Sequence, residues 1–148
     1  ISDGTNITID KSSSYLNTDG VDYVTYAWAN SGPYAFGFFT ANADNDGPVM
    51  NVGGSPQDLT LKDTGAAMSW YAWFPLINNG NVQDTLLITE GTDAAWTSSA
   101  TLDILSTGAK MRSSGGGTPN TTSGNKIIYQ AFGIQPLTDG AVNQGRAK

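Results

Sequence analysis

The chain of 148 residues contains no cysteine and no histidine. Without histidine it can form no Ser/His/Asp triad, no histidine-ligated zinc site and no imidazole acid or base. Without cysteine it has no disulfide framework, no thiolate nucleophile and no thiolate-ligated metal. These two absences exclude the common nucleophilic enzymes and the common zinc sites.

Charge is also scarce, because Asp, Glu, Lys and Arg make up 14% of the residues, against about 25% in typical soluble domains. The seven basic residues are scattered singly and the formal net charge is −6, which argues against binding to DNA or RNA backbones. The longest dense apolar stretch, 70–77, is too short to span a bilayer. The chain opens without a signal peptide or an initiator Met, so we expect a processed portion of a longer protein.

The chain does contain 39% hydrophobic residues, 18 glycines and many runs in which apolar and polar residues alternate. Alternation with period two, broken by turn residues about every ten positions, is typical of antiparallel strands. We therefore expect an all-β fold, an antiparallel β-sandwich of the jelly-roll type, with little or no helix. A weak helix signal lies at 92–97. The predicted strands are 5–10, 21–29, 34–40, 49–52, 58–62, 69–77, 85–89, 101–105, 109–112 and 126–134.

The predicted core takes the large apolar residues of these strands. Its members are Tyr26, Trp28, Phe36, Phe38, Leu59, Leu61, Trp70, Leu86, Ile88, Leu102, Ile104, Ile128 and Phe132. The glycine-rich segment 113–117, with Thr118-Pro119-Asn120 after it, is expected to be exposed and mobile.

The sequence predicts that the chain is divided into three segments. Residues 1–29 are predicted to form N-terminal strands, and an ungapped echo between the two ends of the chain, 104 residues apart, suggests the end of a preceding repeat. Coincidence between two similar hairpins explains that echo equally well. Residues 30–137 form the predicted sandwich domain, and residues 138–148 a polar tail.

A loop with oxygen-bearing residues at alternate positions is the one candidate metal site. Asn42, Asp44 and Asp46 precede Gly47 as in the first half of a calcium loop, but the twelfth position is Gly53, which offers no bidentate carboxylate. Asn, Asp and Gly also favour tight turns. We interpret the segment as a surface turn and expect no metal and no cofactor.

Aromatic residues could stack on sugar rings. In the segment 70–74, period two places Tyr71 and Trp73 on one face of a strand and Trp70 on the other, so one face must be core. Trp96 lies among Thr, Ser and Ala. Trp73, Trp96 and Tyr71 are therefore the possible glycan contacts.

The carboxylates argue against glycoside hydrolysis, which requires two of them at a set separation, usually one with a raised pKa. Glu90 is the single glutamate and stands beside Gly91 in a predicted turn, while Asp103 is flanked by Leu102 and Ile104 on a predicted strand. No catalytic residue is expected, and the protein is predicted not to be an enzyme. Two sequons, at Asn6 and Asn120, are interpreted as loop composition.

Several motifs together resemble a known domain. The matching pieces are Tyr23–Ala29, Phe36–Asn42 followed by Asp46-Gly47-Pro48, Leu102–Arg112 and Ser123–Phe132. They are similar to a β-rich domain of tail-fibre and related structural proteins of tailed phages, particularly marine phages. That family usually has W-V-x-I-K-R where this chain has Asp58–Asp63. It has no established active site to carry over, so each matching piece is a signature of fold.

The resemblance implies a structural, non-enzymatic component of a phage virion, in a tail fibre, spike or capsid fibre. Such a protein would lie on the virion surface, assemble with copies of itself and with other virion proteins, and contact a host-surface glycan. Fibres usually close their strand edges by symmetry, which favours a homotrimer. The alternatives are a carbohydrate-binding module or lectin, and a capsid decoration protein.

Overall fold

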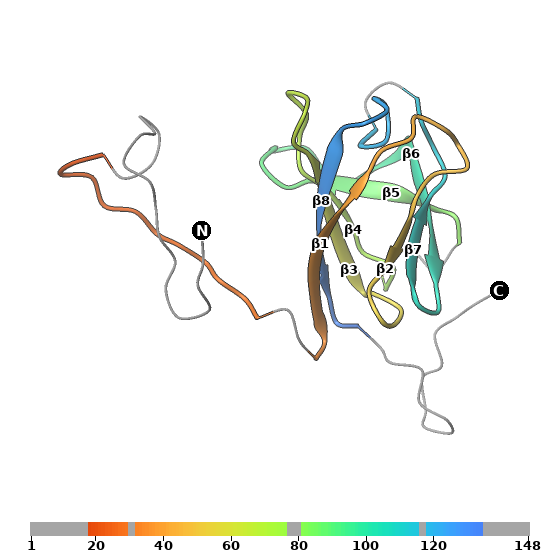
Figure 1. Cartoon of the computed structure of the whole chain (residues 1–148), viewed down its shortest axis with the longest axis horizontal. Helices are drawn as coiled ribbons and strands as arrows, with labels where there is room; N and C mark the ends of the chain where they lie inside the picture. Colours follow the sequence, from red (N-terminus) through yellow and green to blue (C-terminus); the bar gives the residue numbers. More distant parts are fainter. Residues whose placement is uncertain (1–17, 30–31, 77–80, 116–117, 135–148) are drawn as a thin grey trace.

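The computed structural model describes residues 18–29, 32–76, 81–115 and 118–134 (Figure 1). Within these ranges the chain forms eight strands and no helix. The expectation of an all-β fold is confirmed. The strands are β1 (Tyr34–Thr40), β2 (Val49–Asn51), β3 (Asp58–Asp63), β4 (Tyr71–Trp73), β5 (Gln83–Ile88), β6 (Trp96–Leu105), β7 (Gly108–Met111) and β8 (Lys126–Phe132).

All eight strands belong to one antiparallel sheet, in the order β1-β8-β3-β4-β5-β6-β7-β2. The sheet curls until its two end strands, β1 and β2, approach each other without pairing (Figure 1). The result is a nearly closed, barrel-like sheet, and the expected two-layer sandwich is not confirmed. The last strand, β8, lies between β1 and β3 in the sheet, because it pairs with β1 on one side and with β3 on the other.

Most predicted strands recur with shifts of a few residues, because turn residues delimit them. The segment 21–29 is an exception: its residues are exposed and form no strand, despite their β-forming side chains. The helix signal at 92–97 is also wrong, since 96–97 begin β6. The predicted strand at 5–10 and the tail 138–148 lie outside the described residues.

The interior of the barrel is filled by one cluster from every strand. Side chains alternate along β3, where Leu59 and Leu61 are fully buried. On β1 and β8 the inward positions hold smaller residues, including Ala35 and Ala131. The other large, fully buried apolar side chains are Trp73, Met50, Leu86, Leu102, Met111 and Ile127.

The predicted core was correct for Leu59, Leu61, Leu86, Leu102 and Ile104, which are all buried. It was wrong about the faces of β1 and β8. Their pairing places Phe36, Phe38, Ile128 and Phe132 on the outer face and Phe39, Ile127 and Ala131 on the inner one. Tyr26 and Trp28, which lie outside the barrel, are 75% and 50% exposed, and Trp70 and Ile88 are only partly buried.

The reason is the width of the interior. A small barrel is filled by side chains of alternating size, and its inward positions here range from Ala35 and Ala131 to Phe39 and Trp73. Both faces of β8 carry large apolar residues, Ile127 on one and Ile128 with Phe132 on the other, so the apolar residues alone do not decide which face turns inward. At Gly37 the inward position carries no side chain at all, and the Tyr129 ring of β8 lies against it.

Gly108 illustrates how closely β2 and β7 approach. A Cβ atom at this position would collide with the carbonyl oxygen of Met50, a backbone atom of the paired strand. A backbone atom cannot move aside without breaking the pairing that closes this end of the sheet.

We predict that Gly108→Ala lowers the free energy of unfolding by at least about 3 kcal/mol, because it overpacks a site with no room to adjust. Gly115→Ala is the matched control, since nothing lies within 4 Å of its added Cβ, and its change should stay within about 0.5 kcal/mol. Urea unfolding of both variants measures the difference. Equal midpoints for the two variants would contradict the packing described here.

Candidate functional site

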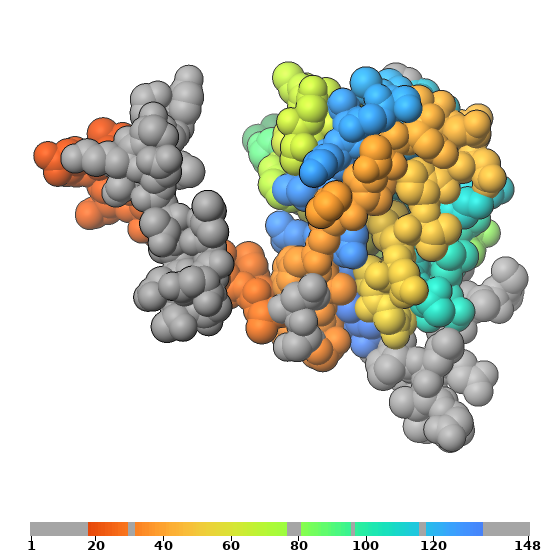
Figure 2. All heavy atoms as spheres, viewed as in Figure 1, coloured from red at the N-terminus to blue at the C-terminus, as the bar shows by residue number. Residues whose placement is uncertain are grey.

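The most unusual surface of the protein is apolar and lies at the N-terminal side of the barrel. Residues 18–29, here called the arm, are exposed, begin with a turn at 19–20 and lead away from the barrel (Figure 1). Figure 2 shows the red end of the arm standing clear of the barrel surface. Val24 is 81% exposed, and Val21 and Tyr23 are also exposed. Side chains of this size are normally withdrawn from water, so the arm is a candidate contact surface.

Where the arm reaches the barrel, aromatic rings form a cluster that we call the seam: Tyr26, Trp28, Tyr34, Phe36 and Phe132. Trp28 stacks on Phe36 with ring centroids 6.0 Å apart and meets the edge of Phe132 at 6.0 Å. Tyr26 stacks on Trp28, again at 6.0 Å. Tyr34 and Phe36 each contact Phe132 edge-on, at 5.7 and 5.6 Å. These separations are those of favourable aromatic pairs.

The seam lies on the outer face of β1 and β8 and stays open to solvent. Tyr34 and Phe132 are register partners, so their side chains share a face. Phe38 continues this face at 60% exposure, with the Lys126 ammonium 4.7 Å from its ring centroid. The rings of the seam are therefore exposed to solvent or only partly buried.

A second feature is the loop after β1, held by the buried amide of Asn120. The Asn120 Oδ1 atom accepts a hydrogen bond from the Asn42 backbone N–H at 3.0 Å. Its Nδ2 group donates to Asn42 Oδ1 at 3.0 Å and to the Asp44 carbonyl at 2.8 Å. Gly47 completes the contact, because a Cβ there would meet Met111 and Asn120. One buried side chain thus holds the backbone and side chains of this loop together.

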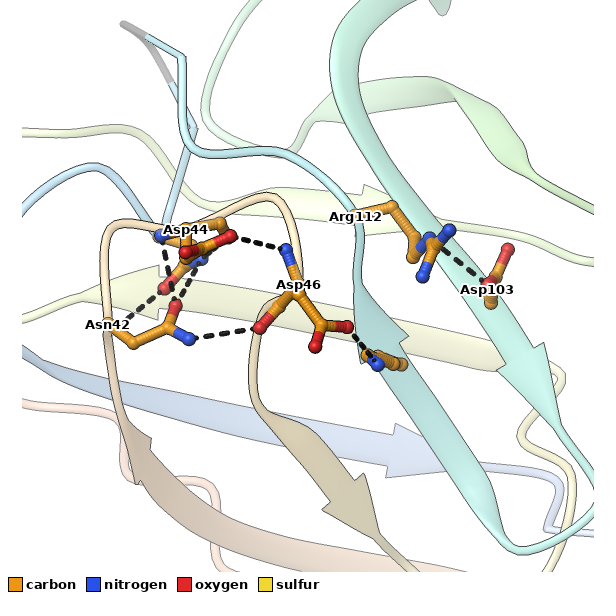
Figure 3. A network of polar contacts seen from close by, with 7 residues as sticks. Asn42, Asp44, Asp46, Asp103 and Arg112 are labelled. Carbon is orange, nitrogen blue, oxygen red and sulfur yellow. Dashed lines mark hydrogen bonds and ion pairs between the residues drawn. The ribbon is translucent and has the colours of Figure 1, made fainter.

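The three candidate calcium ligands of this loop already take part in other bonds (Figure 3). Asn42 Oδ1 accepts from the Asp44 N–H, and Asp44 Oδ1 accepts from the Asp46 N–H, as in Asx turns. Asp46 pairs with Lys110, whose hydrogen bond and charge lower the pKa of the Asp46 carboxyl. Among the described residues no group of three acidic side chains is placed to hold a metal.

The segment after β7 differs from its prediction. Ser113, Thr118 and Asn120 are buried, so this part of the glycine-rich region is not the exposed loop that we expected. The Ser113 hydroxyl accepts from the Thr101 N–H at 3.0 Å, which ties the segment to β6. Because Asn120 is fully buried, its sequon is inaccessible in the folded chain.

The two carboxylates considered for hydrolysis lie in separate places. The Trp70 backbone nitrogen lies 3.1 Å from both carboxylate oxygens of Glu90. Desolvation raises the pKa of Glu90, but hydrogen bonds from the backbone N–H groups of Glu90 and Trp70 outweigh it, so the pKa lies below its ordinary value. A general acid requires the opposite shift. Asp103 forms an ion pair with Arg112, at 3.3 Å (Figure 3).

The predicted glycan contacts are corrected for two of the three aromatic residues. Trp73 is fully buried and Tyr71 is 9% exposed, because β4 is a central strand with both neighbours paired and its side chains pack into the core. Their rings lie 6.2 Å apart. The Trp96 backbone begins β6, and its side chain lies outside the described part of the structure.

Sequence reasoning missed the buried polar residues at one end of the barrel. Asp63 is buried at the end of β3 and accepts from the Asn125 amide at 3.0 and 3.1 Å and from the Gly65 N–H at 2.7 Å. Like Asn120, Asn125 stands in a stretch of polar, turn-forming residues, so composition places both in loops. No local signal distinguishes a buried loop amide from an exposed one.

The fold and these surfaces define an all-β, barrel-like domain with an exposed aromatic arm and no helix long and apolar enough to cross a membrane in the part of the chain described. The chain belongs to a family characterised as a domain of unknown function, DUF7483, which matches residues 2–136. The match includes the arm as well as the barrel. No curated protein and no solved structure matches the chain.

We predict that Asn120→Asp lowers the free energy of unfolding by about 3 kcal/mol, because it removes two donated hydrogen bonds and buries a charge. Asn45→Asp is the matched control. Asn45 is exposed and uses only its Oδ1 atom, as acceptor for Ser114, so this variant should stay within about 0.5 kcal/mol of the parent. Denaturant unfolding compares the two. Similar losses in both variants would contradict the role given to Asn120.

We also predict that millimolar calcium leaves the thermal unfolding midpoint unchanged relative to a sample in chelator. The loop oxygens are occupied by local bonds, and position 53 is a glycine. A ligand that binds only the folded state raises the midpoint, so a calcium-dependent rise of several degrees would show that the loop is a metal site.

Proposed function

We propose that this protein is a structural, non-enzymatic component of a phage virion, in a tail fibre, spike or capsid fibre. In this role it assembles with copies of itself, as a homotrimer, and with other virion proteins at the particle surface. The observation that carries the proposal is the exposed arm and seam. Together they leave a contiguous group of aromatic side chains in contact with solvent, which is unusual for a domain that functions alone. Apolar patches of this kind usually mark protein interfaces.

The resemblance to phage tail-fibre domains supports the virion assignment. Three glycines of the matching motifs serve packing in this chain: Gly37 lies against Tyr129, Gly47 against Met111 and Asn120, and Gly108 against Met50. The matching motifs are thus explained by the fold. The lowered pKa of Glu90 and the Arg112 partner of Asp103 support a non-enzymatic role.

A carbohydrate-binding module is the second candidate, favoured by one observation. Tyr26 and Trp28 stack at 17° and keep 75% and 50% of their surface exposed, which offers flat rings to a sugar. The two candidates separate cleanly, because a glycan platform works in a monomer whereas a fibre domain must associate. A glycan array with Trp28→Ala as negative control tests the second candidate.

We predict that the 148-residue chain forms a stable trimer at tens of micromolar, measured by light scattering. The double variant Tyr26→Ser, Trp28→Ser should be monomeric with an unchanged circular dichroism spectrum, because neither side chain belongs to the barrel core. Leu76→Ser is the control, since Leu76 is 67% exposed outside the arm and seam.

A folded monomer at every concentration would overturn the assembly role. Immunogold labelling of intact phage particles that carry the protein tests its place on the virion. Label confined to lysate, with none on particles, would overturn the virion assignment while leaving self-assembly standing.

A further inference from the structure

The outer face of the sheet carries an acidic side chain beside the seam. Asp58 is the first residue of β3 and the register partner of Phe132, which in turn is the register partner of Tyr34. Directly opposed residues of an antiparallel sheet share a face, so the side chains of Tyr34, Phe132 and Asp58 form one row across three strands. The next residue, Leu59, is fully buried in the barrel, as the alternation along a strand requires if Asp58 lies on the outside.

Asp58 is half-buried without a charge partner. The Thr60 hydroxyl lies 3.4 Å from its Oδ1 atom, and no basic side chain of the described residues forms an ion pair with it. The pKa of the Asp58 carboxyl lies above its ordinary value, because burial disfavours the charged form by more than the Thr60 hydrogen bond favours it. The aromatic row therefore ends in a carboxyl group that is poorly stabilised as an anion.

The titratable groups that share the outer face with Asp58 do not compensate it. They are Lys62 on β3, Lys126 on β8 and Tyr34 on β1. Lys62 stands four residues further along β3, about 13 Å away, and Lys126 lies at the opposite end of β8 from Phe132. On β4, Tyr71 packs with the core and does not face Asp58.

The arm, which meets the barrel at the seam, brings no cation either. Its titratable residues are Asp19, Asp22, Tyr23 and Tyr26. Acidic groups and phenols cannot stabilise a second anion, so the arm offers Asp58 no counter-charge.

A second copy of the chain has no uncommitted cation among the described residues. Each of the four basic residues in that part of the chain already contacts a group of its own chain: Lys62 the Met68 carbonyl, Lys126 the Phe38 ring, Lys110 the Asp46 carboxylate and Arg112 the Asp103 carboxylate. None of them can neutralise Asp58 without giving up that contact. A proton from the solvent neutralises the carboxyl group without such a loss.

We propose that assembly through the seam is coupled to protonation of Asp58, so that the copies associate more strongly at acidic than at neutral pH. This inference rests on the proposed self-assembly and specifies what regulates it. A second copy that covers Tyr34 and Phe132 also removes water from the end of their row, where Asp58 stands. A charged carboxylate loses more by this than a neutral carboxyl group does, so association and protonation favour each other.

The assembled chain then holds the proton on Asp58 more tightly than the monomer does. Each contact takes up a proton between the pKa of Asp58 in the monomer and its higher pKa in the assembly. Within that range the association constant rises by up to about tenfold for each unit by which the pH falls. Below the range Asp58 is protonated in both states, and above it Asp58 is charged in both, so the constant levels off.

Sedimentation equilibrium of the full chain from neutral to mildly acidic pH tests this, with the variants Asp58→Asn and Asp93→Asn. Asp58→Asn keeps the shape of a protonated carboxyl group and removes the charge. Asp93→Asn also removes one charge, from an exposed residue between β5 and β6, so it controls for the change in net charge. At neutral pH we expect Asp58→Asn to associate about tenfold or more tightly than Asp93→Asn, which should keep the pH dependence of the parent.

The carboxyl resonance of Asp58 gives the second readout. We expect its NMR titration midpoint to rise when the protein concentration is raised from that of the monomer to that of the assembly, because assembly favours the protonated form. Circular dichroism at each pH verifies that the chain stays folded over the range compared.

The other outcomes overturn the inference in distinguishable ways. Weaker association of Asp58→Asn than of Asp93→Asn would show that the charged carboxylate meets a cation in the second copy. Equal association of the two variants, or a midpoint that does not change with concentration, would place Asp58 outside the contact. These results leave self-assembly standing, whereas a chain that stays monomeric at every pH overturns both this inference and the proposed self-assembly.

Discussion

The narrow interior of the barrel is the constraint on which the rest of the structure depends. Trp73, Met50 and Met111 fill much of it from β4, β2 and β7, and several inward positions of β1 and β8 hold small residues. Ala35 and Ala131 are among them, and Gly37 leaves room for the Tyr129 ring. Phe39 and Tyr129 also turn inward, whereas Tyr34, Phe36 and Phe132 of the same strands lie on the outer face and form part of the seam. An apolar surface open to partners follows from how the core is packed.

The two ends of the barrel, where the strands begin and finish, differ in their polar contacts, and the difference bears on function. At the end where β1 and β3 finish, buried side chains satisfy the loop backbone: Asn120 holds the loop after β1, and Asp63 with Asn125 joins β3 to the start of β8. Such networks rigidify a region because each member would be costly to leave unpaired. The arm at the opposite end of β1 has no comparable network in the described residues. The structure thus combines a rigid barrel with a projecting segment suited to contact another molecule.

Much of the strand pattern could be read from the sequence, and the reason is local. Gly-Pro, Asp-Gly and Asn-rich segments interrupt strands through backbone preferences that need no tertiary partner, so β1, β3 and β8 begin and end close to their predicted limits. The same reasoning was wrong for the arm, where it predicted a strand at 21–29 that does not form. Its residues favour a strand as strongly as those of β1, but a strand exists only when another strand pairs with it, and none of the described strands pairs with the arm.

The sequence by itself determined the all-β class, the strand and turn order, and the absence of histidine and cysteine chemistry, because each depends on residue type or on neighbours in the chain. Tertiary structure decided which face of β8 turns inward, since each face carries large apolar residues and the choice depends on how the strand pairs with β1 and β3. It also decided that Asn120 is buried while Asn45 is exposed. Two loop asparagines look alike in sequence, and only packing determines which of them lies beneath the loop and must satisfy its backbone.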